Sequence, residues 1–194
     1  MAYLKGKSVA LVANAPVLLT QRLGNEIDKH DVVIRINGAT PIMFPEHIRH
    51  IGTRTHILAG GRLGPYDKNF LRPPKWIWWM KVPPMGEKDR ARLREWCEKH
   101  ERDIPFLQWP YGMEAKLRTA MGAPATTGLR CLKLITHHSM FKSLDVYGMS
   151  FWREGKTSWY SGNEIHPSHD AQLEYDYFMH CYDLKPKGPG RWGA

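Results

Sequence analysis

The sequence predicts a three-layer, Rossmann-like α/β domain with a mostly parallel sheet. Short apolar segments rich in β-branched residues alternate with longer amphipathic segments, which is the order that βαβ units produce. The first strand-like segments are apolar on both faces, as strands buried between two layers of helices are. A chain of 194 residues suits one domain. We therefore expect residues 1–183 to form a single domain and residues 184–194 to follow it as a flexible basic tail.

The predicted strands are short and end at turn-forming residues. The first is the clearest, because its apolar run stops at Asn14 and Pro16. The second stops before Gly38 in the same way. A further hairpin is expected around residues 154–156. The predicted strands are residues 7–13, 31–37, 55–58, 76–80, 104–107 and 144–147, and the predicted hairpin is residues 152–159.

The predicted helices lie between these strands. The clearest is residues 87–100, whose apolar residues recur on one face. After the last predicted helix, proline and glycine dominate the chain, which favours a loose tail over a packed element. The predicted helices are residues 17–27, 87–100, 126–138 and 169–181.

The formal charge of +9 indicates an anionic partner such as a nucleotide, a nucleic acid or an acidic membrane surface. Solubility together with a basic tail explains the charge equally well. Because the basic residues are scattered, the pattern argues against a dedicated nucleic-acid binder. There is no apolar run of about 18 residues and no signal peptide, so we expect a cytoplasmic protein with, at most, peripheral membrane contact.

The sequence favours neither a disulfide framework nor a metal centre. Three cysteines are too few and none forms a CxxC pair. The nearest approach to an Asp-x-Asp pair is Glu174 with Asp176, which lie within a predicted helix and face different ways. His137 and His138 are adjacent rather than one turn apart. We therefore expect no catalytic metal and no bound cofactor.

Two asparagines follow predicted strands of the sheet. Asn14 comes after the first strand and Asn37 after the second, where side-chain amides can donate to a phosphate or ribose oxygen. Ligand sites in such sheets form at these carboxyl ends. The alternative for Asn14 is an Asx turn or a helix cap, and for Asn37 it is turn chemistry before Gly38.

A third polar point is the start of the helix predicted from residue 126. Thr126, Thr127 and Gly128 stand where a helix offers free N–H groups and a partial positive charge, which suit a phosphate or a carboxylate. An ordinary threonine N-cap is an equal alternative.

The fourth point is the start of the last predicted helix. Ser168 is a good N-cap, which would place His169 in the first turn. The helix dipole there disfavours the imidazolium form, and a neutral imidazole is what a general base needs near pH 7. A histidine near a cap with no catalytic role is the alternative.

These segments occur in an order that resembles the sialyltransferases of glycosyltransferase family 29. The family's long motif, its short motif and its final His-to-Glu motif each have a counterpart, and the ordered set carries the resemblance more than any one segment. The matching residues are 9–14, 26–37 and 52–55 for the long motif, 124–129 and 145–148 for the short motif, and His169 with Glu174 for the last.

The resemblance implies a sialyltransferase-type variant of the GT-A fold. It also implies an inverting, metal-independent transferase that moves sialic acid, or a related sugar such as Kdo, from a CMP-sugar to a glycan or glycolipid hydroxyl. By the same resemblance, Asn14 and Asn37 would contact the CMP, residues 126–128 would hold the nucleotide or the donor carboxylate, and His169 would be the general base.

The chain departs from the family pattern at two places. Ser8 stands near the position of one paired cysteine of the family, and Cys131 has no evident partner, which fits a cytoplasmic microbial or viral version. Ser158 stands where the third motif usually has a phosphate-binding histidine, two residues before Tyr160. We place Tyr160 among the donor-binding residues, with His166 as the candidate replacement for the absent histidine.

Two other functions remain open on the sequence. One is a catalytically silent protein that binds CMP-sugars, which the substitution at Ser158 favours. The other is a basic nucleic-acid binder. A nicotinamide-type Rossmann domain is disfavoured, because no G-x-G-x-x-G follows the first strand.

Overall fold

The computed structural model of the chain describes residues 2–37, 45–61, 74–81, 86–99, 103–137, 140–153 and 166–193. The strands are β1 (Ser8–Val12), β2 (Val32–Ile36), β3 (Ile57–Gly60), β4 (Trp76–Trp79), β5 (Phe106–Gln108), β6 (Ser143–Tyr147), β7 (Lys185–Gly188) and β8 (Arg191–Gly193).

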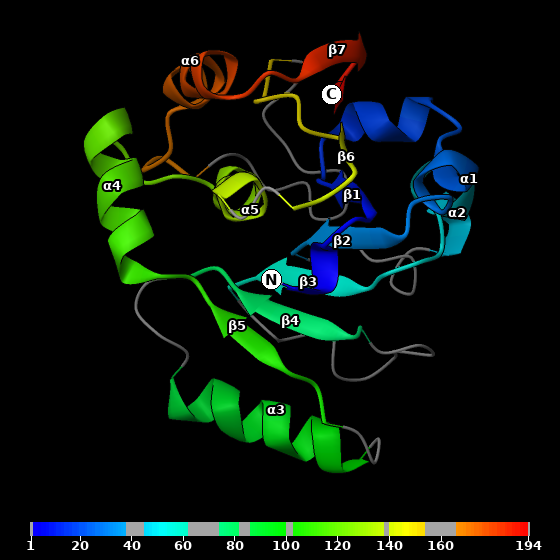
Figure 1. Cartoon of the computed structure of the whole chain (residues 1–194), viewed down its shortest axis with the longest axis vertical. Coiled ribbons are helices and arrows are strands. Elements are labelled where there is room, and N and C mark those ends of the chain that lie inside the picture. Colours follow the sequence, from blue (N-terminus) through cyan, green and yellow to red (C-terminus); the bar gives the residue numbers. More distant parts are fainter. Residues whose placement is uncertain are drawn as a thin grey trace.

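These strands form one sheet in the order β5-β4-β3-β2-β1-β6-β8-β7 (Figure 1). The six strands from β5 to β6 are parallel, and β8 and β7 are added antiparallel at the edge. The mostly parallel α/β fold predicted from the sequence is therefore confirmed.

The helices cover both faces of the sheet. The α-helices are α1 (Gly24–Ile27), α2 (Ile48–Ile51), α3 (Glu87–Lys99), α4 (Tyr111–Met121), α5 (Thr127–His137) and α6 (Ala171–Cys181). Short 3-10 helices are η1 (Ala2–Leu4), η2 (Pro16–Thr20) and η3 (Pro45–His47).

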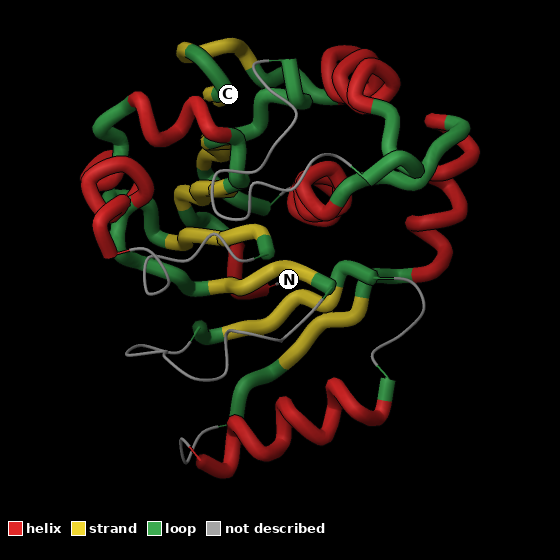
Figure 2. The backbone as a smooth tube through the Cα atoms, turned by 180° about the vertical axis from the view of Figure 1, so that it is seen from behind, coloured by secondary structure: helices red, strands yellow, loops and turns green. Residues whose placement is uncertain are grey.

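Alternate residues of β1 belong to different cores. Val9 and Leu11 are buried with the apolar residues of α4, α5 and α6, whereas Ala10 and Val12 are buried with η2, α1 and α2. The arrangement has three layers, with α4 and α5 on one side of the sheet and α1 and α2 on the other, and it can be followed from behind in Figure 2. Because every residue of β2 is buried, this strand has no solvated face, as the sequence indicated.

The order of the strands creates a switch point. After β1 the chain winds outward through β2, β3, β4 and β5, and then returns to place β6 on the other side of β1. Ligands of open α/β sheets bind outside the carboxyl ends of the strands at such a point. The residues that follow β1 and β6 therefore occupy the favoured position for a ligand.

The prediction of one helix over residues 17–27 is wrong. The segment forms η2 and then the separate short helix α1, which starts at Gly24. A Cβ built on Gly24 would lie 2.2 Å from the carbonyl oxygen of Ile48, so this glycine allows α1 and α2 to touch through their backbones. Helix α4 was not predicted at all.

The prediction of a loose tail after residue 184 also differs from the structure. Val146 of β6 pairs with Trp192 of β8, and β8 pairs in turn with β7. Gly190 allows the tight turn between these two strands with φ of 59°. The tail residues thus complete the sheet beyond β6, where backbone groups would otherwise be unpaired.

Candidate active site at the carboxyl edge of the sheet

Asn14 and Asn37 lie at equivalent positions on neighbouring strands. Val12 is in register with Arg35, and each asparagine follows two residues later. Both residues are half-buried, and neither side-chain amide hydrogen-bonds to another residue that the structure describes. Asn37 has φ of 52°, so it also serves as the left-handed turn residue that its position before Gly38 suggested. Neighbouring strands lie about 4.8 Å apart, so the two amides share one edge.

The start of α5 lies against this edge. A Cβ built on Gly128 would be 3.3 Å from Met149 Cε and 3.6 Å from Ile36 Cδ1. Ile36 is the last residue of β2, and Met149 follows β6. The first N–H groups of a helix have no partner within it, so Thr127 and Gly128 offer donors here. The hydroxyl of Thr127 makes no hydrogen bond to the described residues.

Thr126 is committed to the scaffold. Its hydroxyl donates to Glu174 Oε2 at 2.8 Å and accepts from the N–H of Leu129 at 3.4 Å. The alternative of an ordinary N-cap therefore describes Thr126, while Thr127 and Gly128 keep the groups that could meet a ligand.

Glu174 links α6 to the start of α5. Its carboxylate also accepts from the N–H of Thr126 at 2.5 Å, and only 1% of the residue is exposed. Burial raises the pKa of Glu174 to about 7, although the two bonds from Thr126 and the charge of Arg130 act in the opposite direction. The residue that ends the final motif thus holds the candidate phosphate-binding helix in place.

His169 lies beside the segment that leads into α5. Its Nδ1 is 2.8 Å from the carbonyl oxygen of Pro124. A carbonyl oxygen only accepts, so Nδ1 carries the proton and Nε2 keeps its lone pair in the neutral ring. Burial lowers the pKa of His169, and the charge of Arg130 adds to this effect against the hydrogen bond to Pro124. The ring is therefore neutral near pH 7, with Nε2 as its basic atom.

The predicted cap of the last helix is wrong, and so is the reason given for a neutral His169. Helix α6 is capped by Asp170, whose carboxylate accepts from the N–H groups of Gln172 and Leu173 at 3.0 Å. Ser168 instead bonds with His166 at 2.8 Å. His169 thus precedes the cap rather than sitting in the first turn, and burial rather than the helix dipole lowers its pKa.

The remaining predicted donor residues differ in position. His166 is exposed and lies edge-on to His169, with 6.2 Å between the ring centroids. Tyr160, Ser158 and the hairpin predicted around residues 154–156 lie outside the described residues, so their roles stay predictions.

A buried ion pair that the sequence analysis missed supports α5 from the other side. Arg130 makes a two-pronged contact with Glu114 at 2.7 and 2.8 Å, and donates to the carbonyl oxygen of Met80 at 3.1 Å. The indole N–H of Trp109 donates to the same carboxylate at 2.8 Å. Burial raises the pKa of Glu114, but the bonds from Arg130 outweigh it and hold the pKa below its ordinary value. No sequence signal joins these residues, since they come from separate elements.

The other polar residues of the long motif are scaffold. Arg35 is fully buried on β2 and donates to the carbonyl oxygens of Ile51 at 2.6 Å and Arg54 at 2.9 Å. Asp28 accepts from the N–H and the hydroxyl of Thr53, both at 2.7 Å. Arg54 in turn donates to the carbonyl oxygen of Asp28 at 2.6 Å. These bonds fix the loop that leads into β3.

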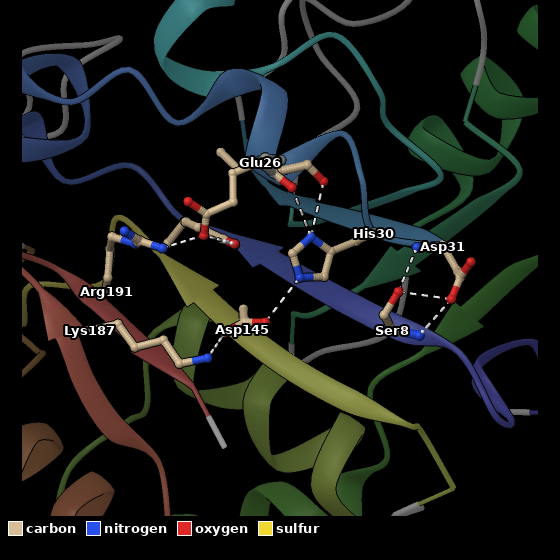
Figure 3. Close-up of polar contacts among 9 residues, drawn as sticks. Ser8, Glu26, His30, Asp31, Asp145, Lys187 and Arg191 are labelled. Carbon is tan, nitrogen blue, oxygen red and sulfur yellow. Dashed lines mark hydrogen bonds and ion pairs between the residues drawn. The ribbon is translucent and has the colours of Figure 1, made fainter.

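Ser8, which the resemblance places near a family cysteine, links the start of β1 to the residue before β2 through hydrogen bonds. Its N–H and its hydroxyl both bond with Asp31 Oδ2 at 2.8 Å (Figure 3). The bonds from the Ser8 N–H and from its hydroxyl lower the pKa of Asp31. Cys97, Cys131 and Cys181 are all free, and Cys131 is buried within α5.

The described residues show neither a cluster of metal-ligating side chains nor a membrane-spanning helix. Among the described residues, the His, Cys, Asp and Glu side chains form no group of three that could hold a metal ion. Of the helices that the structure describes, none has the length and apolar character needed to cross a bilayer.

Comparison with known proteins bears on this same region of the chain. Residues 4–60, which span β1, β2, β3 and the loop that leads into β3, match the model of glycosyltransferase family 29 (sialyltransferase). Over this part of its length the chain is therefore similar to glycosyltransferase family 29. The beta-galactoside alpha-2,6-sialyltransferases 1 of Homo sapiens and Mus musculus are each 41% identical to this chain over 64 residues. That alignment covers 32% of the chain and 15% of each relative.

Solved structures share the fold of this chain over most of its length. A mammalian sialyltransferase in complex with Gal-beta-1-3GalNAc-ortho-nitrophenol superposes with a TM-score of 0.60 at 16% identity. Another structure of a mammalian sialyltransferase gives 0.58 at 17% identity. Each comparison covers 90% of this chain and 65% of the other. At this identity the likeness concerns the fold.

Proposed function

We propose that this protein is an inverting, metal-independent glycosyltransferase that moves sialic acid, or a related sugar such as Kdo, from a CMP-sugar to a hydroxyl of a glycan or glycolipid. The similarity of residues 4–60 to the model of glycosyltransferase family 29 supports glycosyl transfer. The observation that carries the proposal is the hydrogen bond from His169 Nδ1 to Pro124, which leaves a basic Nε2 beside the start of α5.

The transfer needs two services from the protein. The bond between the anomeric carbon and the phosphate oxygen breaks, and the electron pair leaves with CMP. The acceptor oxygen forms the new bond on the opposite face, which inverts the anomeric carbon, and its proton goes to His169 Nε2. Stabilising the departing phosphate and removing that proton therefore lower the barrier.

The residues that would serve the leaving group are those whose polar groups have no other partner among the described residues. The N–H groups of Thr127 and Gly128 open α5, where the partial positive charge of a helix stabilises a phosphate. The amides of Asn14 and Asn37 lie on the neighbouring strand ends and would contact the phosphate and the ribose or cytidine. Thr126 and Glu174 keep the helix start in place. No step in this scheme needs a metal.

The test is incubation with CMP-sialic acid and with CMP-Kdo, each with a panel of glycans and with and without EDTA, while CMP release and glycan mass are followed. Acceptor-dependent CMP release that EDTA leaves unchanged is expected with one donor. CMP binding without release or transfer would indicate the silent binding protein instead. Absence of CMP binding would refute the proposal.

A further inference from the structure

The C-terminal hairpin (β7 and β8, residues 185–193) contacts Met149, which lies beside the start of α5, and also contacts α6. We propose that Trp192 of this hairpin is a positioning residue for the transfer reaction, a role that rests on the proposed function. The residue lies outside the region that matches the family model, which ends at residue 60. It also lies outside the segments that resemble the family motifs.

One path of contacts, the first arm, runs from Trp192 to the start of α5. The indole Nε1 donates to the carbonyl oxygen of Met149 at 3.0 Å, and the N–H of Met149 donates to Gly190 at 3.2 Å. The hairpin therefore holds the backbone of Met149 from both sides. The side chain of Met149 lies 3.3 Å from where a Cβ of Gly128 would be. Movement of Met149 would thus reach the helix start that is expected to meet the leaving phosphate.

The second arm runs through α6. The ring of Trp192 packs against Phe178 with 4.9 Å between centroids and against Tyr175 with 6.4 Å. Tyr175 directly follows Glu174, which bonds to Thr126, and the helix begins just after His169. The indole therefore supports the helix that begins two residues after the proposed base.

Backbone strain beside Trp192 is consistent with this role. Phe151 and Trp152 both have positive φ, at 51° and 55°, which is unfavourable for residues with bulky side chains. Such conformations persist where the surroundings determine them, and they gather at functional sites. The ring of Phe151 packs against Phe178 at 4.9 Å and Trp192 at 6.4 Å between centroids.

Polar contacts fasten the hairpin to the opposite face of the sheet. Lys187 Nζ bonds with Asp145 at 2.6 Å, and Arg191 pairs with Glu26 (Figure 3). The amide of Gln21 also donates to the carbonyl oxygen of Pro189 at 2.9 Å. Because these contacts hold the hairpin against the sheet, the hairpin can fix the position of the indole relative to Met149 and to α6.

Two variants of Trp192 test the two arms separately. Trp192→Phe keeps an aromatic ring against α6 but removes the bond to Met149, so the donor KM should rise about fivefold with little change in kcat. Trp192→Ala removes both arms, and the displaced base should lower kcat about tenfold as well. Lys185→Ala is the matched control, because Lys185 lies in the same hairpin and its exposed side chain forms an ion pair with the exposed Asp183, away from both arms.

Hydrogen exchange provides a readout that does not depend on activity. Well below the melting temperature of each variant, amides of residues 126–130 should exchange faster in both Trp192 variants. Amides of residues 169–175 should exchange faster in Trp192→Ala alone, and Lys185→Ala should match the wild type in both segments. If the wild type transfers no sugar, the proposed function fails, while these exchange rates still decide whether Trp192 positions the two segments.

The proposal is overturned if both Trp192 variants melt at lower temperature but keep wild-type exchange in the two segments. Wild-type kcat and KM in an active enzyme would overturn it too. Either result would make Trp192 a stabilising residue of the core and nothing more.

Discussion

The strand ends at Asn14 and Asn37 and the loop around Asp28 and Arg54 belong to the same matched region, yet they use their polar groups in opposite ways. The amides of Asn14 and Asn37 bond to nothing else that the structure describes. Asp28 and Arg54, by contrast, bond to the backbone of neighbouring segments at 2.6 to 3.0 Å. The matched region therefore contains both a scaffold and the candidate site.

The comparison teaches that free bonding capacity, rather than membership of a motif, separates the two. The same distinction divides neighbours in the short motif, where Thr126 is bonded to Glu174 and Thr127 is not. Changes at the scaffold should lower stability, and changes at the site should lower binding or transfer with little effect on stability. The predictions that follow test this division.

The largest expected effect is on the rate of transfer. His169→Ala should lower kcat by about 10²- to 10⁴-fold, because it removes the proposed base, while affinity for CMP stays near that of the wild type. Steady-state kinetics and calorimetry measure the two quantities. His180→Ala, at an exposed histidine of α6, is the control. Wild-type turnover in His169→Ala would show that His169 is not the base.

A scaffold change should act on stability instead. Arg35→Leu leaves the carbonyl oxygens of Ile51 and Arg54 buried without their donor, so the free energy of unfolding should fall by about 3 kcal/mol. Arg22→Leu, at an exposed arginine, should change it by less than about 0.5 kcal/mol. Urea unfolding measures both. Equal effects would mean that Arg35 does not carry the scaffold.

The raised pKa of Glu174 should make the stability of the protein depend on pH. Its pKa is about 7 in the folded protein and 4.5 ordinarily, so the folded state binds the extra proton between these values. Stability should therefore rise as pH falls from about 7 to 4.5, by up to about 3 kcal/mol from this group. Glu174→Gln, which resembles the protonated acid, should flatten that rise in urea unfolding. Glu95→Gln, at an exposed carboxylate, should leave the rise intact, and an unchanged rise in Glu174→Gln would contradict the assignment.

The smallest effect is on nucleotide affinity. Asn37→Gly removes the amide without backbone strain, because glycine tolerates φ of 52°. Loss of one hydrogen bond to a charged or polar group of CMP should raise the Kd about tenfold. Calorimetry with Asn25→Ala as an exposed control gives the comparison. Unchanged affinity in Asn37→Gly would place Asn37 with the scaffold.

The sequence was most informative where a strand is buried on both faces. β1, β2 and β4 were each predicted to within one residue or two, since largely apolar runs define them. β6 was predicted equally closely although its residues alternate between buried and half-buried at the start. The sequence also indicated that Asn14 and Asn37 share one edge, because parallel strands end together. The structure adds their register.

The errors arose where distant residues decide the local structure. The Pro- and Gly-rich end of the chain looks like a tail, but Arg191 finds its partner Glu26 across 165 positions. The break between η2 and α1 depends on contact of Gly24 with α2. The choice of Asp170 over Ser168 as a cap could not be read either, since both residue types cap helices well.

Titration of the protein with CMP, followed by amide NMR, tests the division between scaffold and site most directly. The account predicts that the amide signals of Asn14, Asn37, Thr127 and Gly128 shift together on saturable binding, while those of Asp28 and Arg35 hold still. Shifts confined to another face of the molecule, or no binding at all, would contradict it.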